Sequence, residues 1–156
     1  MEEVRKSLDT AQLLESYREL LQQVDSLPLR VTGNSMAPFL VHGRDTVTLS
    51  RISRPLKTGD MVLYQRSGGA YVLHRIARCQ NGVYTMVGDA QTFLEPGISA
   101  SQIIAVVSSV CRKGKNLGPH DFWWVFFEKI WIRLLPMRPA LLRLYGALRK
   151  CFGRLL

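Results

Sequence analysis

Ser35 is the first residue whose type and position could do chemistry, because it lies where an extended run gives way to a bend. It follows Gly33 and Asn34, and Pro38 comes three residues later. A bend of this composition can turn a serine hydroxyl toward solvent. The backbone N–H of Ser35 can point into the same space and supply one donor of an oxyanion hole. A serine in a turn is usually structural, so its importance depends on its companions.

His74 is the first companion. On a strand it shares a face with Val72 and Ile76, so its ring points toward the apolar side. Alone it would be interpreted as a core histidine. Asp89, directly after a strand, and Glu95, six residues further on, are acids that could hold an imidazole in one tautomer, as in a serine–histidine–acid arrangement. Asp89 could equally be a turn residue that closes the strand.

A lysine base is the alternative to His74. Lys57 is the only lysine of the β-rich region and lies in a loop beside Pro55. A serine–lysine dyad needs a desolvated ammonium whose pKa has fallen, whereas histidine has a reference pKa of about 6.5. We therefore favour His74 as the base and interpret His42 and His120 as incidental. No metal-ligand spacing occurs, and we expect neither a metal nor a cofactor.

The chain of 156 residues predicts one domain with terminal extensions. Apolar residues recur at helical spacing from Leu8 to about Val24, which predicts an amphipathic helix ending near Pro28. Met1-Glu2-Glu3 lacks the basic start of a secretory signal, so we expect no export signal. Three cysteines without a CxxC pair favour a reduced setting.

The region from residue 29 to 110 has a sequence pattern typical of β-structure. Turn sequences such as Gly68-Gly69 and Asn81-Gly82 separate short runs of β-forming residues. Connections this short favour antiparallel pairing. We expect a compact, mainly β, antiparallel domain. The predicted strands are Leu29–Thr32, Thr46–Leu49, Met61–Gln65, Tyr71–Cys79, Val83–Val87 and Ile103–Val110.

The last 45 residues differ from the rest in charge and composition. The net charge is +9, yet residues 1–111 hold 11 Lys and Arg against 10 Asp and Glu, and residues 112–156 hold 10 against 2. We predict a linker at 113–119, then an aromatic and basic helical tail that contains all three tryptophans. Tryptophan and leucine interleaved with lysine and arginine are typical of a segment at the interface of an anionic membrane.

Other interpretations of the tail remain open. The segment could be a pair of helices packed on the β-domain with a basic outer face, or it could bind RNA or a protein partner. Glu128 and Lys129 interrupt the apolar run, so we do not expect it to span a bilayer. We expect no nucleic-acid partner, because the aromatic and basic pattern on strands that single-strand binders use is missing. The predicted units are therefore 1–28, 29–112 and 113–156.

Four sequence stretches in this order, NSMAPFLVHGRD, KTGDMVLYQ, VLHRI and YTMVGDA, resemble successive motifs of the type I signal peptidases. The likeness covers about residues 29–110 and is strongest to the ER-type branch, in which the general base is histidine. The resemblance implies a β-rich fold with a shallow apolar cleft. It also implies attack by serine on a peptide bond that follows small residues of an extended substrate.

Carried over position by position, the resemblance makes Ser35 the nucleophile, His74 the general base, and Asp89 or Glu95 the acid that orients it. It places Met36, Pro38, Val72 and Leu73 in the substrate-binding region. Gly33 stands where some relatives carry a hydroxyl of the oxyanion hole, and Ala90 replaces an asparagine. The usual N-terminal transmembrane helix is replaced by the polar amphipathic helix.

The sequence thus predicts a membrane-associated serine endopeptidase that removes a leader or signal peptide from a precursor protein, with its catalytic domain facing the cytoplasm. Residues 122–156 would contact an anionic membrane surface. Two alternatives are a non-catalytic peptide-binding or regulatory module with the same fold, and a maturation protease dedicated to one small precursor.

Overall fold

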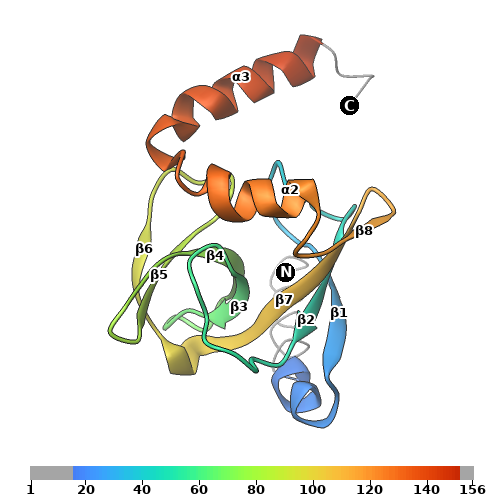
Figure 1. Cartoon of the computed structure of the whole chain (residues 1–156), viewed down its shortest axis with the longest axis vertical. Coiled ribbons are helices and arrows are strands. Elements are labelled where there is room, and N and C mark those ends of the chain that lie inside the picture. The colour runs from blue at the N-terminus through green and yellow to red at the C-terminus, as the bar shows by residue number, and fades with distance from the viewer. Residues whose placement is uncertain (1–15, 152–156) are drawn as a thin grey trace, which may run out of the picture.

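The computed structural model describes residues 16–151 of the chain (Figure 1). Residues 16–23 form a helix, which confirms the second half of the predicted N-terminal helix; residues 8–15 of that prediction lie outside the described part. The hydroxyl of Tyr17 donates a hydrogen bond of 2.6 Å to the carbonyl oxygen of Pro28. This contact joins the helix to the first strand.

The fold is one curled antiparallel sheet. The order of its hydrogen-bonded strands is β1-β2-β7-β3-β4-β5-β6. A further strand, β8, forms a hairpin with β7. Every pairing is antiparallel, as the short connections predict. The strands of the described region are β1 Ser26–Arg30, β2 Thr46–Ser50, β3 Met61–Gln65, β4 Tyr71–Gln80, β5 Val83–Val87, β6 Glu95–Ser99, β7 Ile103–Arg112 and β8 Lys115–Leu117.

Two strands were not predicted. β6 contains Pro96 and Gly97, which disfavour a strand, and it forms because it pairs with β5. β8 lies inside the stretch predicted as a linker, so that part of the prediction is wrong. Lys113 and Gly114 take positive φ values of 51° and 76° and turn the chain back, so that Lys115–Leu117 pairs with the end of β7.

The C-terminal segment is helical, as predicted. α2 Phe122–Val125 continues without a break as the π-helix η2 Phe126–Trp131, and the single turn η3 Leu135–Met137 leads into α3 Arg138–Cys151. Figure 1 shows α2 and η2 lying across one end of the curled sheet, with α3 above them. Among residues 16–151, no helix is both long and apolar enough to cross a bilayer.

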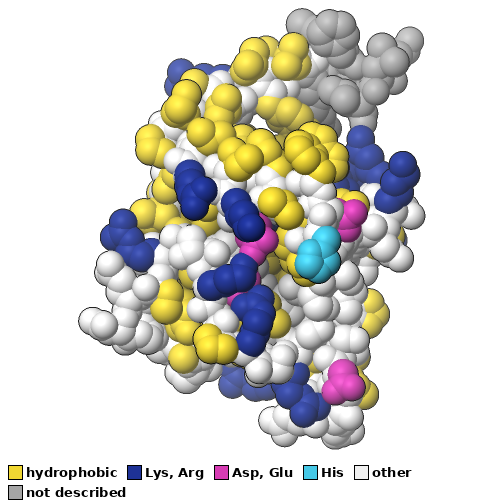
Figure 2. Space-filling model, viewed as in Figure 1, with side chains coloured by type: hydrophobic (Ala, Val, Ile, Leu, Met, Phe, Trp, Pro, Cys, Tyr) yellow, Lys and Arg dark blue, Asp and Glu magenta, His cyan; other side chains and the backbone are white. Residues whose placement is uncertain are grey.

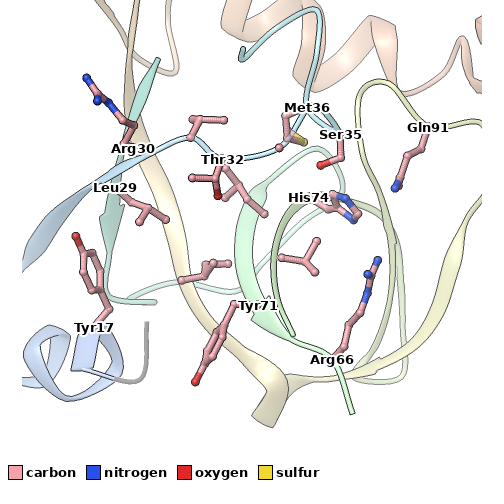
Figure 3. Close-up of a pocket in the computed structure, with 15 residues that line it drawn as sticks. Tyr17, Leu29, Arg30, Thr32, Ser35, Met36, Arg66, Tyr71, His74 and Gln91 are labelled. Atoms are coloured by element: carbon pink, nitrogen blue, oxygen red, sulfur yellow. The ribbon is translucent and has the colours of Figure 1, made fainter. Parts of the chain in front are cut away.

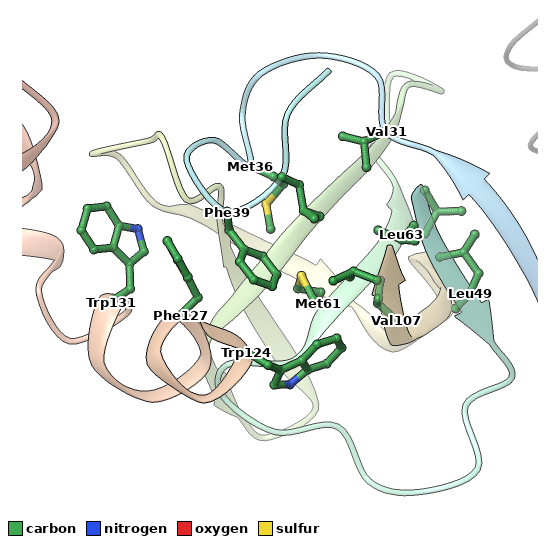
Figure 4. Close-up of a cluster of buried hydrophobic side chains, with 14 of the residues drawn as sticks. Val31, Met36, Phe39, Leu49, Met61, Leu63, Val107, Trp124, Phe127 and Trp131 are labelled. Atoms are coloured by element: carbon green, nitrogen blue, oxygen red, sulfur yellow. The ribbon is translucent and has the colours of Figure 1, made fainter. Parts of the chain in front are cut away.

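β3 lies between two clusters of buried side chains, so its residues from Met61 to Tyr64 are all buried. Met61 and Leu63 face the larger core, while Val62 and Tyr64 face a second cluster. Figure 4 shows Trp124, Phe127 and Trp131 extending from the C-terminal helices into the larger core near Phe39. Part of the predicted tail therefore packs on the β-domain, in line with the alternative of packed helices. The larger core contains Leu21, Val31, Met36, Phe39, Leu40, Val47, Leu49, Met61, Leu63, Ala105, Val107, Val110, Trp124, Phe127 and Trp131.

Candidate active site

Ser35 and His74, which are 39 positions apart in the sequence, line the same pocket. The pocket has a volume of about 530 Å³. In Figure 3 the two side chains lie at one end of it, and Tyr17 and Tyr71 lie at the other. Its walls are mostly apolar. The lining residues are Tyr17, Leu29, Arg30, Val31, Thr32, Gly33, Ser35, Met36, Leu63, Arg66, Tyr71, Val72, Leu73, His74 and Gln91.

Ser35 lies in the loop after β1, and the loop after β5 fixes its backbone. The Ala90 N–H donates a hydrogen bond of 2.8 Å to the carbonyl oxygen of Ser35. Gly88 packs against that carbonyl so closely that a Cβ at its position would lie 2.5 Å from the oxygen. The next residue, Met36, is buried and anchors the loop in the core. Ser35 itself is half-buried, with its side chain at the pocket.

His42 holds the residues that precede Ser35. The N–H of Gly33 donates to Nδ1 of His42 at 3.0 Å, and the Gly43 N–H donates to the Val31 carbonyl oxygen at 2.9 Å. Gly33 has a φ of 78°, a conformation that a side chain would strain. His42, interpreted as incidental from the sequence, is therefore part of the loop that carries the nucleophile.

His74 lies on β4 with its ring on the predicted apolar face. It pairs with Val62 of β3, and only 1% of its surface is exposed. This burial, together with the positive charge of Arg66, lowers the pKa of His74 to about 4, and the charge of Glu95 opposes the shift. The imidazole is therefore neutral at physiological pH, which is the protonation state of a general base.

Tyr64 lies between His74 and Glu95. Its hydroxyl oxygen is 3.1 Å from Nδ1 of His74 and 2.8 Å from Oε2 of Glu95, whereas Nδ1 and Oε2 are 4.0 Å apart. Arg66 holds the carboxylate with two hydrogen bonds of 2.7 and 2.6 Å. These bonds, with that of Tyr64, keep the pKa of Glu95 below its usual value despite burial. Of the two predicted acids, Glu95 is the one in the histidine network.

No hydrogen bond joins Ser35 and His74 within the part of the chain that the structure describes. Nε2 of His74 is buried and has no hydrogen-bond partner among residues 16–151. Nδ1 contacts Tyr64 at 3.1 Å, so Nε2 is the ring nitrogen that remains for Ser35. Catalytic hydrogen bonds often form only when substrate is bound, so this geometry is compatible with a serine–histidine pair.

Asp89 does not orient His74, which corrects one of the two predictions for the acid. Its fully buried carboxylate accepts from Nε of Arg75 at 2.9 and 3.1 Å. Arg75 follows His74 on β4, so its side chain leaves the opposite face of the strand. Burial raises the pKa of Asp89, and the charge of Arg75 opposes the shift. The pair is buried in the core, where the guanidinium carbon of Arg75 lies 5.1 Å from the centre of the Phe39 ring.

Two further sequence candidates lie outside the pocket. Lys57 pairs with Asp60 and with Glu128 of η2, and these interactions raise its pKa although its burial lowers it. A base needs the opposite shift, so Lys57 does not replace His74. Pro38 is absent from the pocket wall, and its carbonyl oxygen accepts from Arg112 at 3.4 Å. Met36, Val72 and Leu73 do line the pocket.

Sequence reasoning did not find Tyr64, Arg66 or Gln91. Tyr64 stands in an apolar run that is typical of any core strand, and its contact depends on the register of β3 against β4. Gln91 lines the pocket, and its Oε1 accepts from the Gly88 N–H at 2.9 Å. A signal for Arg66 was its position next to the Ser67-Gly68-Gly69 turn, which brings β3 and β4 together.

The sequence was also compared with known proteins. No family model matches the chain, and no curated protein matches it significantly.

Proposed function

We propose that the protein is a serine endopeptidase that cleaves a leader or signal peptide from a precursor, with Ser35 as nucleophile and His74 as general base. The observation that carries the proposal is the pocket shared by these two residues, together with the outer edges of β1 and of the first half of β4 beside it. The resemblance of the four sequence motifs to the type I signal peptidases points the same way.

The strand edges favour an extended peptide as substrate. Within the described region β1 pairs with β2 on one side only, and residues Val72–His74 of β4 pair in the sheet only with β3. Leu29 of β1 and Leu73 of β4 both line the pocket. A peptide in the pocket could add as a strand to such an edge, and its alternate side chains would then enter the apolar space.

The chemistry follows from the two residues. Ser35 Oγ attacks the carbonyl carbon of the scissile bond while its proton passes to Nε2 of His74. The imidazolium returns that proton to the leaving amine as the C–N bond breaks. His74 next takes a proton from a water molecule that attacks the acyl ester, and it returns this proton to Ser35 Oγ as the ester C–O bond breaks. The Ser35 N–H is one donor to the oxyanion.

The test compares the N-termini of cellular proteins, by mass spectrometry, in cells that express the wild type or Ser35→Ala. The matched control is Ser53→Ala, which changes an exposed serine outside the pocket. We expect termini after small residues that are lost only in Ser35→Ala. A single affected precursor would identify a dedicated maturation protease. Identical termini, with both proteins folded and equally abundant, would reject the peptidase and favour the peptide-binding module.

We also propose that the protein works at an anionic membrane surface, through what we call the basic-aromatic surface. Figure 2 shows apolar side chains gathered over the part of the molecule where α2 and α3 lie. The exposed apolar residues there are Phe122, Trp123, Ile130, Met137, Leu144, Tyr145 and Leu148, and the exposed basic residues of the same segment are Lys129, Arg133, Arg143 and Lys150.

The charge of this segment favours lipid headgroups. Residues 129–151 contain no acidic residue, and the two acids before them are Asp121 and Glu128. Glu128 is 9% exposed and is paired with Lys57. Exposed leucine and tryptophan side chains can enter the headgroup region while lysine and arginine contact anionic lipid. The prediction that the catalytic domain faces the cytoplasm stays a prediction.

Vesicle flotation tests this part. The full chain should float with phosphatidylcholine vesicles that contain phosphatidylglycerol, and less with phosphatidylcholine alone. Leu144→Glu with Leu148→Glu should abolish flotation. Val83→Glu, which changes an equally exposed apolar residue of β5, should not. A wild type that fails to float with either vesicle, or a double variant that floats as well as the wild type, would reject the membrane surface.

A further inference from the structure

Tyr64 joins His74 and Glu95 through one atom, its hydroxyl oxygen. Its hydroxyl oxygen lies 3.1 Å from the imidazole Nδ1 and 2.8 Å from the carboxylate. The tyrosine side chain is fully buried, and its ring centre is 6.0 Å from that of His74. Tyr64 lies on β3 and His74 on the adjacent strand β4. His74 is opposite Val62, which is two positions before Tyr64 and therefore on the same face of the sheet.

The direction of these hydrogen bonds follows from the chemistry of the acid. An ionised carboxylate can only accept, so the hydroxyl proton of Tyr64 must point to Glu95. Arg66 binds both oxygens of Glu95 and favours its ionised form. Toward His74, the Tyr64 oxygen can then act only as an acceptor. Nδ1 must therefore carry the imidazole proton, which leaves the lone pair on Nε2.

We infer that Tyr64 is a positioning residue, which holds His74 in the Nδ1–H tautomer and connects it to Glu95. A role of Tyr64 in catalysis rests on the proposed function, whereas the assignment of the His74 tautomer is independent of it. In a serine–histidine–acid arrangement the acid itself accepts from Nδ1. Here the carboxylate is 4.0 Å from Nδ1, and a phenol takes its place.

This arrangement leaves the correct nitrogen for Ser35. Nε2 is buried and has no partner within residues 16–151, so the lone pair is not used by another donor. When Nε2 accepts the proton of Ser35, the imidazolium keeps its Nδ1–H bonded to the Tyr64 oxygen. The Tyr64 proton stays on the phenol throughout, because burial and the charge of Glu95 raise the pKa of Tyr64. The negative charge of Glu95 then faces the imidazolium across the phenol.

The test is the ¹⁵N NMR spectrum of the His74 ring in the full chain, which distinguishes the two tautomers without any substrate. We expect Nδ1–H in the wild type. In Glu95→Ala, Tyr64 loses its acceptor and can donate to Nδ1, so the tautomer should change to Nε2–H. Glu95 is partly exposed, so this variant should fold. In Tyr64→Phe both tautomers should appear, and Tyr84→Phe, on β5, is the matched control.

Kinetics supply the second measurement. Tyr64→Phe should lower kcat by about 10- to 100-fold with little change in KM, since a positioned general base contributes about 100- to 10,000-fold. An Nε2–H tautomer in the wild type, or a Tyr64→Phe variant with the wild-type tautomer and kcat, would overturn the inference. In a protein without peptidase activity, Nδ1–H in the wild type, Nε2–H in Glu95→Ala and both tautomers in Tyr64→Phe would uphold the assignment of Tyr64 and reject only the proposed function.

Discussion

Trp131 Nε1 donates a hydrogen bond of 2.9 Å to the carbonyl oxygen of Asp89. Arg138 adds to this contact, because its Nη1 donates to the carbonyl oxygens of Gly88 and Gln91 at 2.9 and 3.1 Å. The C-terminal segment therefore holds the loop whose Ala90 N–H fixes the carbonyl of Ser35. The position of the candidate nucleophile depends on residues almost one hundred positions further along the chain.

Trp131→Phe tests this connection. The substitution keeps an aromatic ring in the core but removes the indole donor, and the Asp89 carbonyl oxygen loses its partner. Leaving a buried acceptor unpaired costs about 1–3 kcal/mol, so the free energy of unfolding should fall by about that amount in urea denaturation. Trp123→Phe changes a tryptophan that is 46% exposed and should have little effect. Equal stabilities of the two variants would contradict this assignment.

Gly88→Ala tests the packing behind Ser35. The new Cβ would lie 2.5 Å from the Ser35 carbonyl oxygen, so the nucleophile loop must move. A displacement of about 1 Å at a catalytic group can lower the rate about 100-fold. We expect a loss of that size in cleavage of a peptide substrate. Gly68→Ala is the control, since a Cβ there meets nothing within 4 Å. A fully active Gly88→Ala enzyme would show that the loop can shift without consequence.

The strands that the sequence predicted are those whose signals are local. Met61–Gln65 and Val83–Val87 have the predicted bounds, because runs of β-forming residues lie between turn sequences. Asn81 and Gly82 take φ values of 50° and 76°, as a tight hairpin requires. β6 and β8 form because they pair with β5 and β7, and a local sequence pattern does not show which segments will pair.

The same distinction applies to the site. The resemblance to the type I signal peptidases predicted that Ser35 and His74 act together, and strand alternation predicted which face of the strand His74 occupies. The choice between Asp89 and Glu95 depended on which face of β4 each acid approaches, and this requires the three-dimensional loop path. Trp123 and Trp124 are adjacent residues of the same type, yet Trp123 is exposed and Trp124 is in the core. Composition alone predicted an interface for both.

The low pKa of His74 predicts how stability depends on pH. Its pKa falls from 6.5 to about 4 on folding, so the unfolded chain binds more protons between these two values. The stability conferred by His74 is therefore complete above pH 6.5 and is lost as the pH falls toward 4. One pKa unit corresponds to about 1.4 kcal/mol, so the loss is of the order of 3 kcal/mol.

The measurement is urea denaturation at pH 7 and pH 4.5 for the wild type and His74→Gln. The variant should lose less stability between the two values, because carboxyl groups such as Glu95 titrate in both proteins and only the histidine differs. The same pKa predicts that kcat/KM of the wild type stays constant from pH 7 down to about pH 5. An activity that falls with a midpoint near 6.5 would show that His74 titrates as an exposed histidine.

Asp89→Ala and Glu95→Ala should differ in kind, because the two acids have different partners. Asp89→Ala leaves Arg75, which is fully buried, without its counter-charge, and breaking a buried ion pair in this way costs about 3–5 kcal/mol. Glu95→Ala breaks a pair with Arg66 that is partly exposed, and should cost about 1 kcal/mol or less. Thermal unfolding would measure the loss of stability in each variant. Cleavage kinetics at a temperature where both variants are folded would measure kcat. We expect Asp89→Ala to lose stability and Glu95→Ala to lose kcat. A stable Asp89→Ala protein with a low kcat would return Asp89 to the histidine network, against the pairing with Arg75.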